Sequence, residues 1–217
     1  MYNTALFDLD GTLINSEIGI TDSVAYALSK FGIIVEDKKT LKPFIGPPLA
    51  ESFSKFYGFS EEKATEAVTY YREYFSEKGI YENPPYEGVE EMLINLKNHG
   101  ISLMLATSKY EVFAKVILEH LGFAKYFDLV VGSLKDGSRG SKKEVIEYIL
   151  AQKNISDLSS VVMVGDRKHD MIGAKETNLD AIGVLYGFGD REELSSHGAT
   201  YIAKTPSDVF DIIVHSH

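Results

Sequence analysis

The sequence contains no cysteine among its 217 residues. Disulfides and thiolate metal sites are therefore excluded, and a bound metal would need oxygen or imidazole ligands. Hard cations such as magnesium and calcium, which prefer oxygen, become the natural candidates for any metal site.

Positive charge is also scarce. The chain has 22 Lys and Arg against 32 Asp and Glu, a formal net charge of -10. Proteins that bind the phosphate backbone of nucleic acids need clustered Lys and Arg. We therefore expect no nucleic-acid polymer as a partner.

Long hydrophobic runs are missing as well. No stretch approaches the roughly 20 apolar residues of a membrane span. The first residues carry acids at Asp8 and Asp10, unlike the basic-then-apolar layout of a signal peptide. We expect a cytoplasmic protein without a membrane partner, either a monomer or a weak dimer.

What the sequence does contain is enough apolar material, 44% of residues, for a sizeable core. Short apolar or β-branched runs have the length of buried strands. Helical patterns such as Val112, Val116 and Leu121 lie between the later runs. This alternation predicts an α/β fold with a Rossmann-like parallel sheet covered on both sides. The five runs are 5–9, 101–106, 129–131, 161–164 and 181–185.

About ninety residues separate the first run from the second, far more than a crossover helix uses. Helical spacing of Ile20, Val24 and Phe31 within this connection predicts an inserted α-helical subdomain. The prolines after Asn83 mark its end, because proline cannot continue a helix. We expect a helical insert over residues 16–81, between core segments 1–15 and 82–217.

Polar residues gather where the predicted strands end, which is where open parallel sheets bind ligands. Each has a plain local explanation: a turn for Asp-Gly, a helix cap for Thr107 or Asp166, a solvated surface for a lysine. Their common placement at strand ends favours a functional site instead. The residues are Asp8, Asp10, Thr107, Ser108, Lys109, Lys142, Asp166 and Asp170.

In this order the motifs resemble those of the haloacid-dehalogenase-like hydrolase superfamily, over essentially the whole chain and including a helical cap after the first strand. Residues 8–13, Asp-Leu-Asp-Gly-Thr-Leu, and the turn at 45–49 are similar to the phosphoglycolate-phosphatase-like branch. Residues 136–139, Asp-Gly-Ser-Arg ahead of Lys142, are similar to members described as bacterial 5'-nucleotidases.

The resemblance implies a magnesium (Mg2+) cofactor. By resemblance, Asp8 attacks phosphorus and binds the metal, and Asp166 supplies a second carboxylate. Asp10 would bind the metal through its backbone carbonyl, leaving its side chain free as general acid and then base. Asp170 would orient a metal-bound water.

The resemblance also implies substrate contacts. Thr107 and the backbone amide of Ser108 would bind phosphate oxygens, and Lys142 would add positive charge as the transition state forms. Gly46 in the insert and Lys109 are further substrate-binding candidates, and Arg139 is another candidate, although a surface ion pair also explains Lys109 and Arg139. His169 lies near the predicted site, but no step needs an imidazole.

We therefore expect a magnesium-dependent phosphatase that hydrolyses a small phosphorylated metabolite through an aspartyl-phosphate, as in phosphoglycolate phosphatases. A 5'-nucleotidase acting on nucleoside monophosphates and a sugar phosphomutase of the same fold are alternatives. A catalytically silent binding module is an alternative from another class. The cap carries no residue that decides the substrate.

Overall fold

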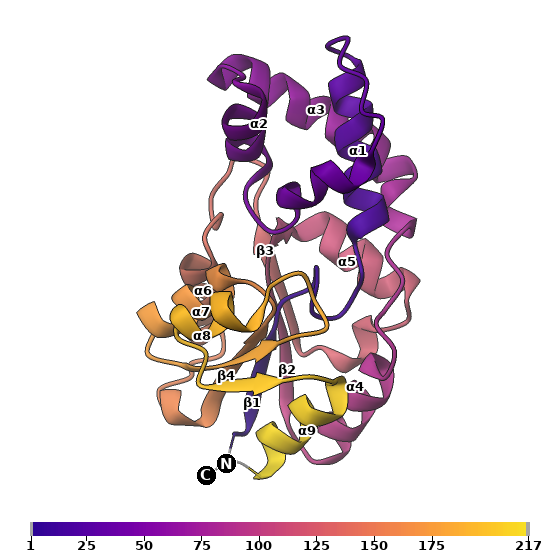
Figure 1. Cartoon of the computed structure of the whole chain (residues 1–217). Helices are drawn as coiled ribbons and strands as arrows, with labels where there is room; N and C mark the ends of the chain where they lie inside the picture. Colours follow the sequence, from indigo (N-terminus) through magenta and orange to yellow (C-terminus); the bar gives the residue numbers. More distant parts are fainter. Residues whose placement is uncertain (1, 216–217) are drawn as a thin grey trace. The chain divides into compact units, whose positions relative to one another are not determined.

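The computed structural model describes residues 2–215, which form two compact units (Figure 1). One unit joins the residues up to Ile14 with those from Pro85 onward, and the other is Asn15–Pro84. The division lies one residue earlier at the entry, and three residues later at the exit, than the sequence predicts. The reason is that the backbone N–H of Asn15 donates to the carbonyl of Pro84 (2.8 Å), which ties the two connections of the insert together.

The first unit contains a six-stranded parallel sheet with the order β3-β2-β1-β4-β5-β6. The predicted α/β class and parallel sheet are confirmed. Five strands match the predicted runs, and the sixth was not predicted. The strands are β1 Thr4–Phe7, β2 Ser102–Tyr110, β3 Leu129–Ser133, β4 Val161–Gly165, β5 Asp180–Val184 and β6 Tyr201–Ala203.

The register of the central strands aligns their carboxyl ends. Phe7, the last residue of β1, pairs with Leu105 of β2 and with Val164 of β4. The residues that follow these three positions therefore leave the sheet at the same edge. Since β1 is central, its continuation at Asp8 lies between those of β2 and β4.

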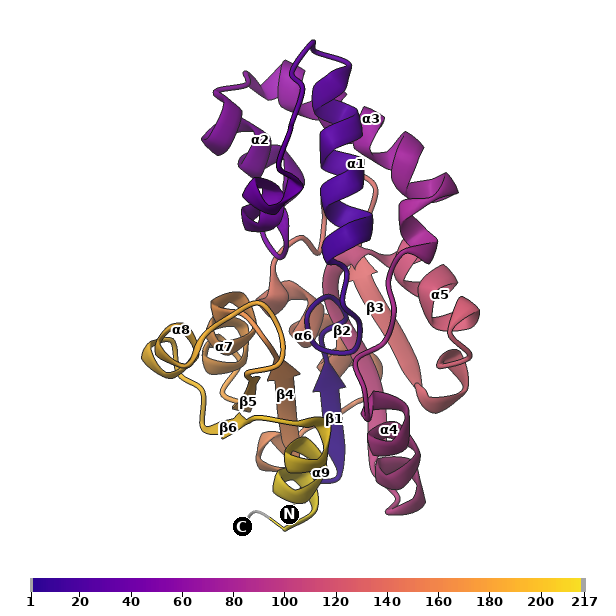
Figure 2. The same ribbon diagram turned by 45° about the vertical axis from the view of Figure 1, so that its right-hand side comes forward.

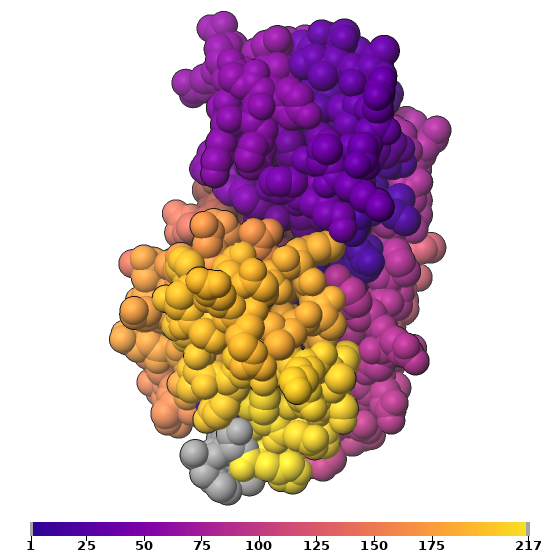
Figure 3. Space-filling view, in the orientation of Figure 1, coloured from indigo at the N-terminus to yellow at the C-terminus, as the bar shows by residue number. Residues whose placement is uncertain are grey.

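Helices cover both faces of this sheet (Figure 2). A cluster of buried apolar residues packs one face against three helices through Ile146, Met171 and Leu194. These helices are α6 Lys142–Gln152, α7 Lys168–Glu176 and α8 Arg191–Ser196. The remaining helices of this unit are α4 Val89–Asn98, α5 Glu111–His120 and α9 Pro206–His215. Of these, α4 and α9 contact each other and lie side by side at the surface (Figure 3).

The second unit is helical, with α1 Glu17–Ser29, α2 Leu49–Tyr57 and α3 Glu61–Glu77. Aromatic rings form much of its interior: the Phe53 ring lies 5.0 Å from that of Phe44 and 5.9 Å from that of Phe59, between ring centroids. Gly46 stands in the turn before α2 with φ +104°, a backbone conformation that favours glycine. This unit thus has an apolar core of its own.

Short 3₁₀ segments complete the described chain: η1 Lys38–Phe44, η2 Gly79–Tyr81, η3 Ala124–Tyr126 and η4 Leu158–Ser160. Among the helices of residues 2–215, none has both the length and the apolar character needed to cross a bilayer.

Candidate functional site

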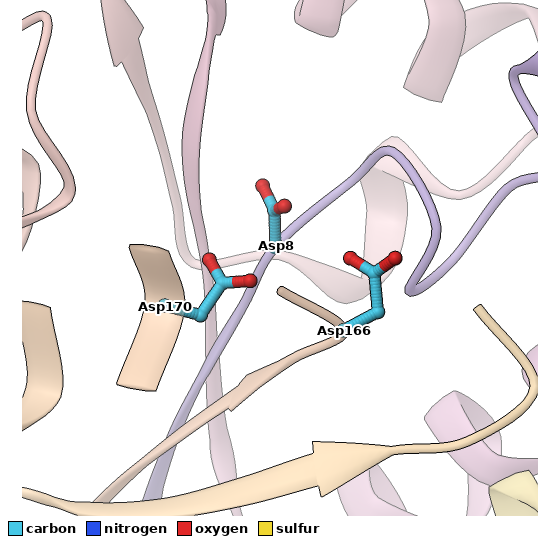
Figure 4. Close-up of side chains that lie close together, drawn as sticks. All are labelled: Asp8, Asp166 and Asp170. Atoms are coloured by element: carbon cyan, nitrogen blue, oxygen red, sulfur yellow. The ribbon is translucent and has the colours of Figure 1, made fainter. Parts of the chain in front are cut away.

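Three carboxylates meet at the carboxyl edge of the sheet. Asp8 follows β1, Asp166 follows β4, and Asp170 lies in the first turn of α7. One oxygen of each lies within 4.8 Å of one oxygen of both others, and the three groups surround a common space (Figure 4). Asp166 and Asp170 are at most 1% exposed and Asp8 is 9% exposed. The site brings together acids that are up to about 160 residues apart in the sequence.

Backbone N–H groups hold these carboxylates in place. The N–H of Arg167 donates to Oδ2 of Asp170 (3.1 Å), and the N–H of Phe188 donates to Oδ2 of Asp166 (2.8 Å). The interpretation of Asp166 as a helix cap is wrong, because α7 is preceded by Arg167 and the carboxylate of Asp166 turns toward Phe188. The other oxygen of Asp166, Oδ1, is buried and has no hydrogen-bond partner among the described residues.

Lys142, the first residue of α6, is not the solvated lysine that its type alone favours. Its Nζ lies 2.8 Å from Oδ1 of Asp8 and 2.8 Å from Oδ1 of Asp170, and it donates to the carbonyl of Ala106 (2.7 Å). The side chain is only 3% exposed. Lys142 therefore places one fixed positive charge against the carboxylates.

This charge does not balance the site. Three buried carboxylates face one ammonium group, which leaves two negative charges uncompensated. Burial raises the pKa of Asp8 to about 6, with Lys142 opposing and Asp170 adding to the shift. Burial, together with the charges of Asp170 and Asp8, raises the pKa of Asp166 well above its ordinary range. Burial lowers the pKa of Lys142, but its two carboxylate partners outweigh this and raise it overall.

Asp10 is paired with Lys109. The Nζ of Lys109 lies 3.0 and 3.1 Å from the two carboxylate oxygens of Asp10, and the side chains are 8% and 13% exposed. The Asp10 side chain thus contacts Lys109, and its role as general acid and base stays a prediction. The interpretation of Lys109 as a surface ion pair is wrong, because both partners are largely buried.

Lys109 contacts Asp10 because β2 continues as far as Tyr110. The pairing of β2 with β3 is irregular between Ala106 and Tyr110. Thr107 is buried inside this extension, and its Oγ1 accepts from the N–H of Lys109 (3.2 Å). It does not cap a helix, since α5 begins only after Tyr110. Thr107 and Ser108 stand just beyond Leu105, the partner of Phe7, and so at the same edge as Asp8.

Sequence reasoning missed the segment after β5. Phe188 of this segment donates its N–H to Asp166. A side-chain carbon added at Gly187 would overlap both the Asp166 side chain and the carbonyl of Gly11. A carbon added at Gly189 would overlap the backbone of Asp166. The glycine spacing after the fifth run was the available signal, since glycine marks a close approach of backbone.

Three other candidates have different surroundings. Arg139 forms an ion pair with Glu111 at the start of α5 (2.9 Å) and lies over the ring of Tyr148. His169 is half-buried, and burial lowers its pKa. Gly46 belongs to the inserted unit, so its contact with a substrate stays a prediction.

The fold and this site are those of a hydrolase family. The model of that family, described as haloacid dehalogenase-like hydrolase, matches residues 5–184. The chain belongs to this family, as its motifs predict, and its similarity to the relatives named below shows that it is a phosphatase.

Among particular proteins, the chain is 44% identical over 200 residues to a 5'-nucleotidase of Pseudomonas aeruginosa, covering 92% of this chain and 90% of that protein. It is 36% identical over 197 residues to the tyrosine-protein kinase PtkA of Mycobacterium tuberculosis, covering 91% and 67%. A crystal structure of a predicted phosphatase from Clostridium acetobutylicum superposes with a TM-score of 0.95 at 50% identity, covering 99% of both chains.

The donor set fits the magnesium ion that this family generally uses. All three candidate ligands are carboxylates, the oxygen donors that hard cations prefer. The buried Oδ1 of Asp166, which no described residue hydrogen-bonds, could bind a metal ion. A divalent cation would also cancel the two negative charges that Lys142 leaves uncompensated.

Proposed function

We propose that the protein hydrolyses a small phosphomonoester in a magnesium-dependent reaction, through an aspartyl-phosphate on Asp8. The observation that supports this most is the charge imbalance at the site: three buried carboxylates against the single ammonium of Lys142. A phosphomonoester is itself a dianion, so these residues can receive it only beside a cation. When bound, Mg²⁺ neutralises the carboxylates and polarises the phosphoryl group.

In this proposal Asp8, Asp166 and Asp170 hold the cation. The assignment of Asp170 to a ligand rather than to an orienting role rests on its place in the same cluster of oxygens. Lys142 fixes one carboxylate oxygen of Asp8 and thereby orients the nucleophile. It also keeps its positive charge at neutral pH, because its carboxylate partners raise its pKa, and so stabilises charge on the phosphoryl oxygens.

The reaction then has two steps. In the first, the carboxylate of Asp8 bonds to phosphorus, the bond from phosphorus to the ester oxygen breaks, and Asp10 gives a proton to the departing alcohol. In the second, Asp10 takes a proton from the water that attacks the aspartyl-phosphate. Phosphate leaves and Asp8 is restored. Thr107 and the backbone N–H of Ser108 bind phosphate oxygens at the end of β2.

For the substrate we propose a nucleoside 5'-monophosphate. The support is the 5'-nucleotidase of Pseudomonas aeruginosa, which is 44% identical over nine-tenths of both chains. Phosphoglycolate is the second candidate, because residues 8–13 and 45–49 are similar to that branch of the family. Both substrates are small phosphorylated metabolites, and both require the same phosphoryl chemistry at Asp8.

The test is a panel of phosphate esters with the purified protein. Inorganic phosphate release is measured from a nucleoside 5'-monophosphate, phosphoglycolate, a hexose phosphate and an aryl phosphate, each with Mg²⁺ and with EDTA. We expect magnesium-dependent release and the highest kcat/KM for the nucleotide. Highest kcat/KM for phosphoglycolate would overturn the substrate assignment alone.

Two results would overturn the reaction itself. Isomerisation of the hexose phosphate that depends on a bisphosphate activator would make the protein a mutase. No release from any ester, together with no effect of Mg²⁺ on the protein, would make it a binding module.

A further inference from the structure

One buried hydroxyl beside the site has no role in the reaction described above. Tyr186 follows β5, and its Oη is shielded from solvent without a hydrogen-bond partner among residues 2–215. Buried tyrosine hydroxyls in folded proteins are nearly always hydrogen-bonded, because an unpaired one loses its bonds to water and gains none. Such a group indicates a ligand or a bound water that completes it.

The hydroxyl belongs to the segment that encloses Asp166. Phe188, two residues further, donates its N–H to Oδ2 of Asp166, and Gly187 packs so closely on Asp166 that no side chain fits between them. The ring of Tyr86 packs edge-on against that of Tyr186, with 5.2 Å between ring centroids. The Tyr186 ring therefore packs against Tyr86 in the same segment that encloses Asp166, a candidate cation ligand.

Within the part of the chain that the structure describes, two polar atoms of this enclosure lack hydrogen-bond partners: Oη of Tyr186 and Oδ1 of Asp166. Burial, followed by the negative charge of Asp166, raises the pKa of Tyr186. Like any phenol, the Tyr186 side chain is protonated at neutral pH, and its hydroxyl can accept as well as donate a hydrogen bond. A hydroxyl oxygen and a carboxylate oxygen, both unpaired and both buried, suit a hydrated cation, whose polarised waters donate hydrogen bonds while a carboxylate binds the ion directly.

We propose that Tyr186 is a positioning residue of the cation site, whose hydroxyl oxygen accepts a hydrogen bond from a water bound to the ion that Asp166 ligates. This rests on the proposed magnesium dependence. Groups that hydrogen-bond the surroundings of a metal fix its ligands and strengthen its binding. Tyr186 touches neither phosphorus nor the leaving group in this assignment, so it contributes to cation affinity and not to the bond-breaking steps.

The experiment is the substitution Tyr186→Phe, which keeps the ring and its packing on Tyr86 and removes only the hydroxyl. Mg²⁺ is titrated against the substrate-free protein while the melting temperature is followed. Mn²⁺ is titrated at 25 °C with free ion measured by electron paramagnetic resonance. We expect both midpoints to rise by about tenfold, with the melting temperature in EDTA and kcat at saturating Mg²⁺ close to those of the wild type.

Tyr126→Phe is the matched control. Its hydroxyl donates to Glu90 (3.1 Å), a residue of α4 outside the carboxylate cluster, so its loss should leave both cation midpoints unchanged.

Equal cation midpoints for Tyr186→Phe and the wild type would overturn the inference, as would equal midpoints for Tyr186→Phe and Tyr126→Phe. This failure differs from that of the proposed function. If the wild type binds Mg²⁺ and hydrolyses esters while Tyr186→Phe binds the ion equally well, only the role of Tyr186 is lost. If the wild type itself shows no response to Mg²⁺, the proposed function fails first.

Discussion

At the scale of single residues, Lys142 shows how position changes the meaning of a residue type. Most lysines are exposed, yet this one is buried between Asp8 and Asp170. Burial alone would discharge an ammonium group, and only the two carboxylates keep it charged. The residues of the site therefore depend on each other for their charge states.

The nucleophile offers the most direct test at this scale. Asp8→Asn is nearly isosteric, so the fold should be retained, but an amide cannot form the acyl phosphate. We expect inorganic phosphate release to fall by a factor of about 10⁴ or more, with an unchanged circular dichroism spectrum. Substantial activity in the variant would exclude Asp8 as the nucleophile.

Lys109 contacts both oxygens of Asp10 and should act through it. We expect Lys109→Met to lower kcat by about tenfold, the value of one charge-assisted hydrogen bond. Asp10→Asn, which removes the proton carrier itself, should lower kcat by about 10²–10⁴. In the double variant the two losses should not add, because Lys109 has no acid to hold once Asp10 is gone.

Lys115→Met is the control for Lys109, since Lys115 forms an ion pair with Glu111 on α5 and its side chain is 50% exposed. It should leave kcat unchanged. The leaving group gives a second check. An aryl leaving group needs little protonation, so the Lys109 and Asp10 variants should slow the first step less with an aryl phosphate than with an alkyl phosphate. Fully additive losses in the double variant would mean that Lys109 acts independently of Asp10.

At the scale of elements, the segment after β5 acts as a wall of the site. Gly187→Ala should be damaging, because the added carbon would overlap Asp166 and the carbonyl of Gly11. We expect the variant to fold with a lower melting temperature and to lose its response to Mg²⁺, measured by thermal melting with and without the ion.

Gly140→Ala provides a comparison for Gly187→Ala, because its added carbon would meet only the carbonyl oxygen of Gly137, at 3.1 Å. That variant should keep the response to Mg²⁺. A Gly187→Ala protein with the same Mg²⁺ midpoint as the wild type would show that the close packing does not position Asp166.

The same scale shows what the sequence could predict. Apolar runs identified five strands because buried parallel strands are continuously hydrophobic. β6 was missed because it has only three residues, two of them half-buried. The true end of β2 was missed because residues 107–110 are mostly polar, and their strand conformation depends on pairing of Tyr110 with Ser133 of β3. A local sequence pattern cannot predict pairing with a partner so far away in the sequence.

The acids of the site could be predicted from the sequence, but the contacts that depend on tertiary structure could not. These acids stand at strand ends, a position that apolar runs reveal. The contact of Lys109 with Asp10 joins residues 99 positions apart and depends on the irregularity in β2, so no spacing rule indicates it. The sequence did not indicate Tyr186 as a site residue, because only the three-dimensional packing determines whether a hydroxyl is buried and hydrogen-bonded.

At the scale of the whole molecule, the candidate cation ligands all belong to the unit that joins both ends of the chain. A ligand that binds only the folded form stabilises it by RT ln(1 + [L]/Kd). At ten times the dissociation constant this is about 1.4 kcal/mol, or about 3–6 °C in melting temperature for a chain of this size. If the two units melt separately, only the transition of the unit with the sheet should move.

We expect Asp166→Asn to change both the melting temperature without Mg²⁺ and its rise when Mg²⁺ is added. The amide removes one uncompensated buried charge and still offers an oxygen to the N–H of Phe188, so in EDTA the variant should melt above the wild type. It should also lose the rise with Mg²⁺, because a ligand charge is gone. The two proteins would then change order as Mg²⁺ is added, which differential scanning calorimetry at neutral pH can follow. A variant that melts below the wild type in EDTA would show that the charge of Asp166 is already balanced by the protein, and the argument from uncompensated charge to a divalent cation would fail with it.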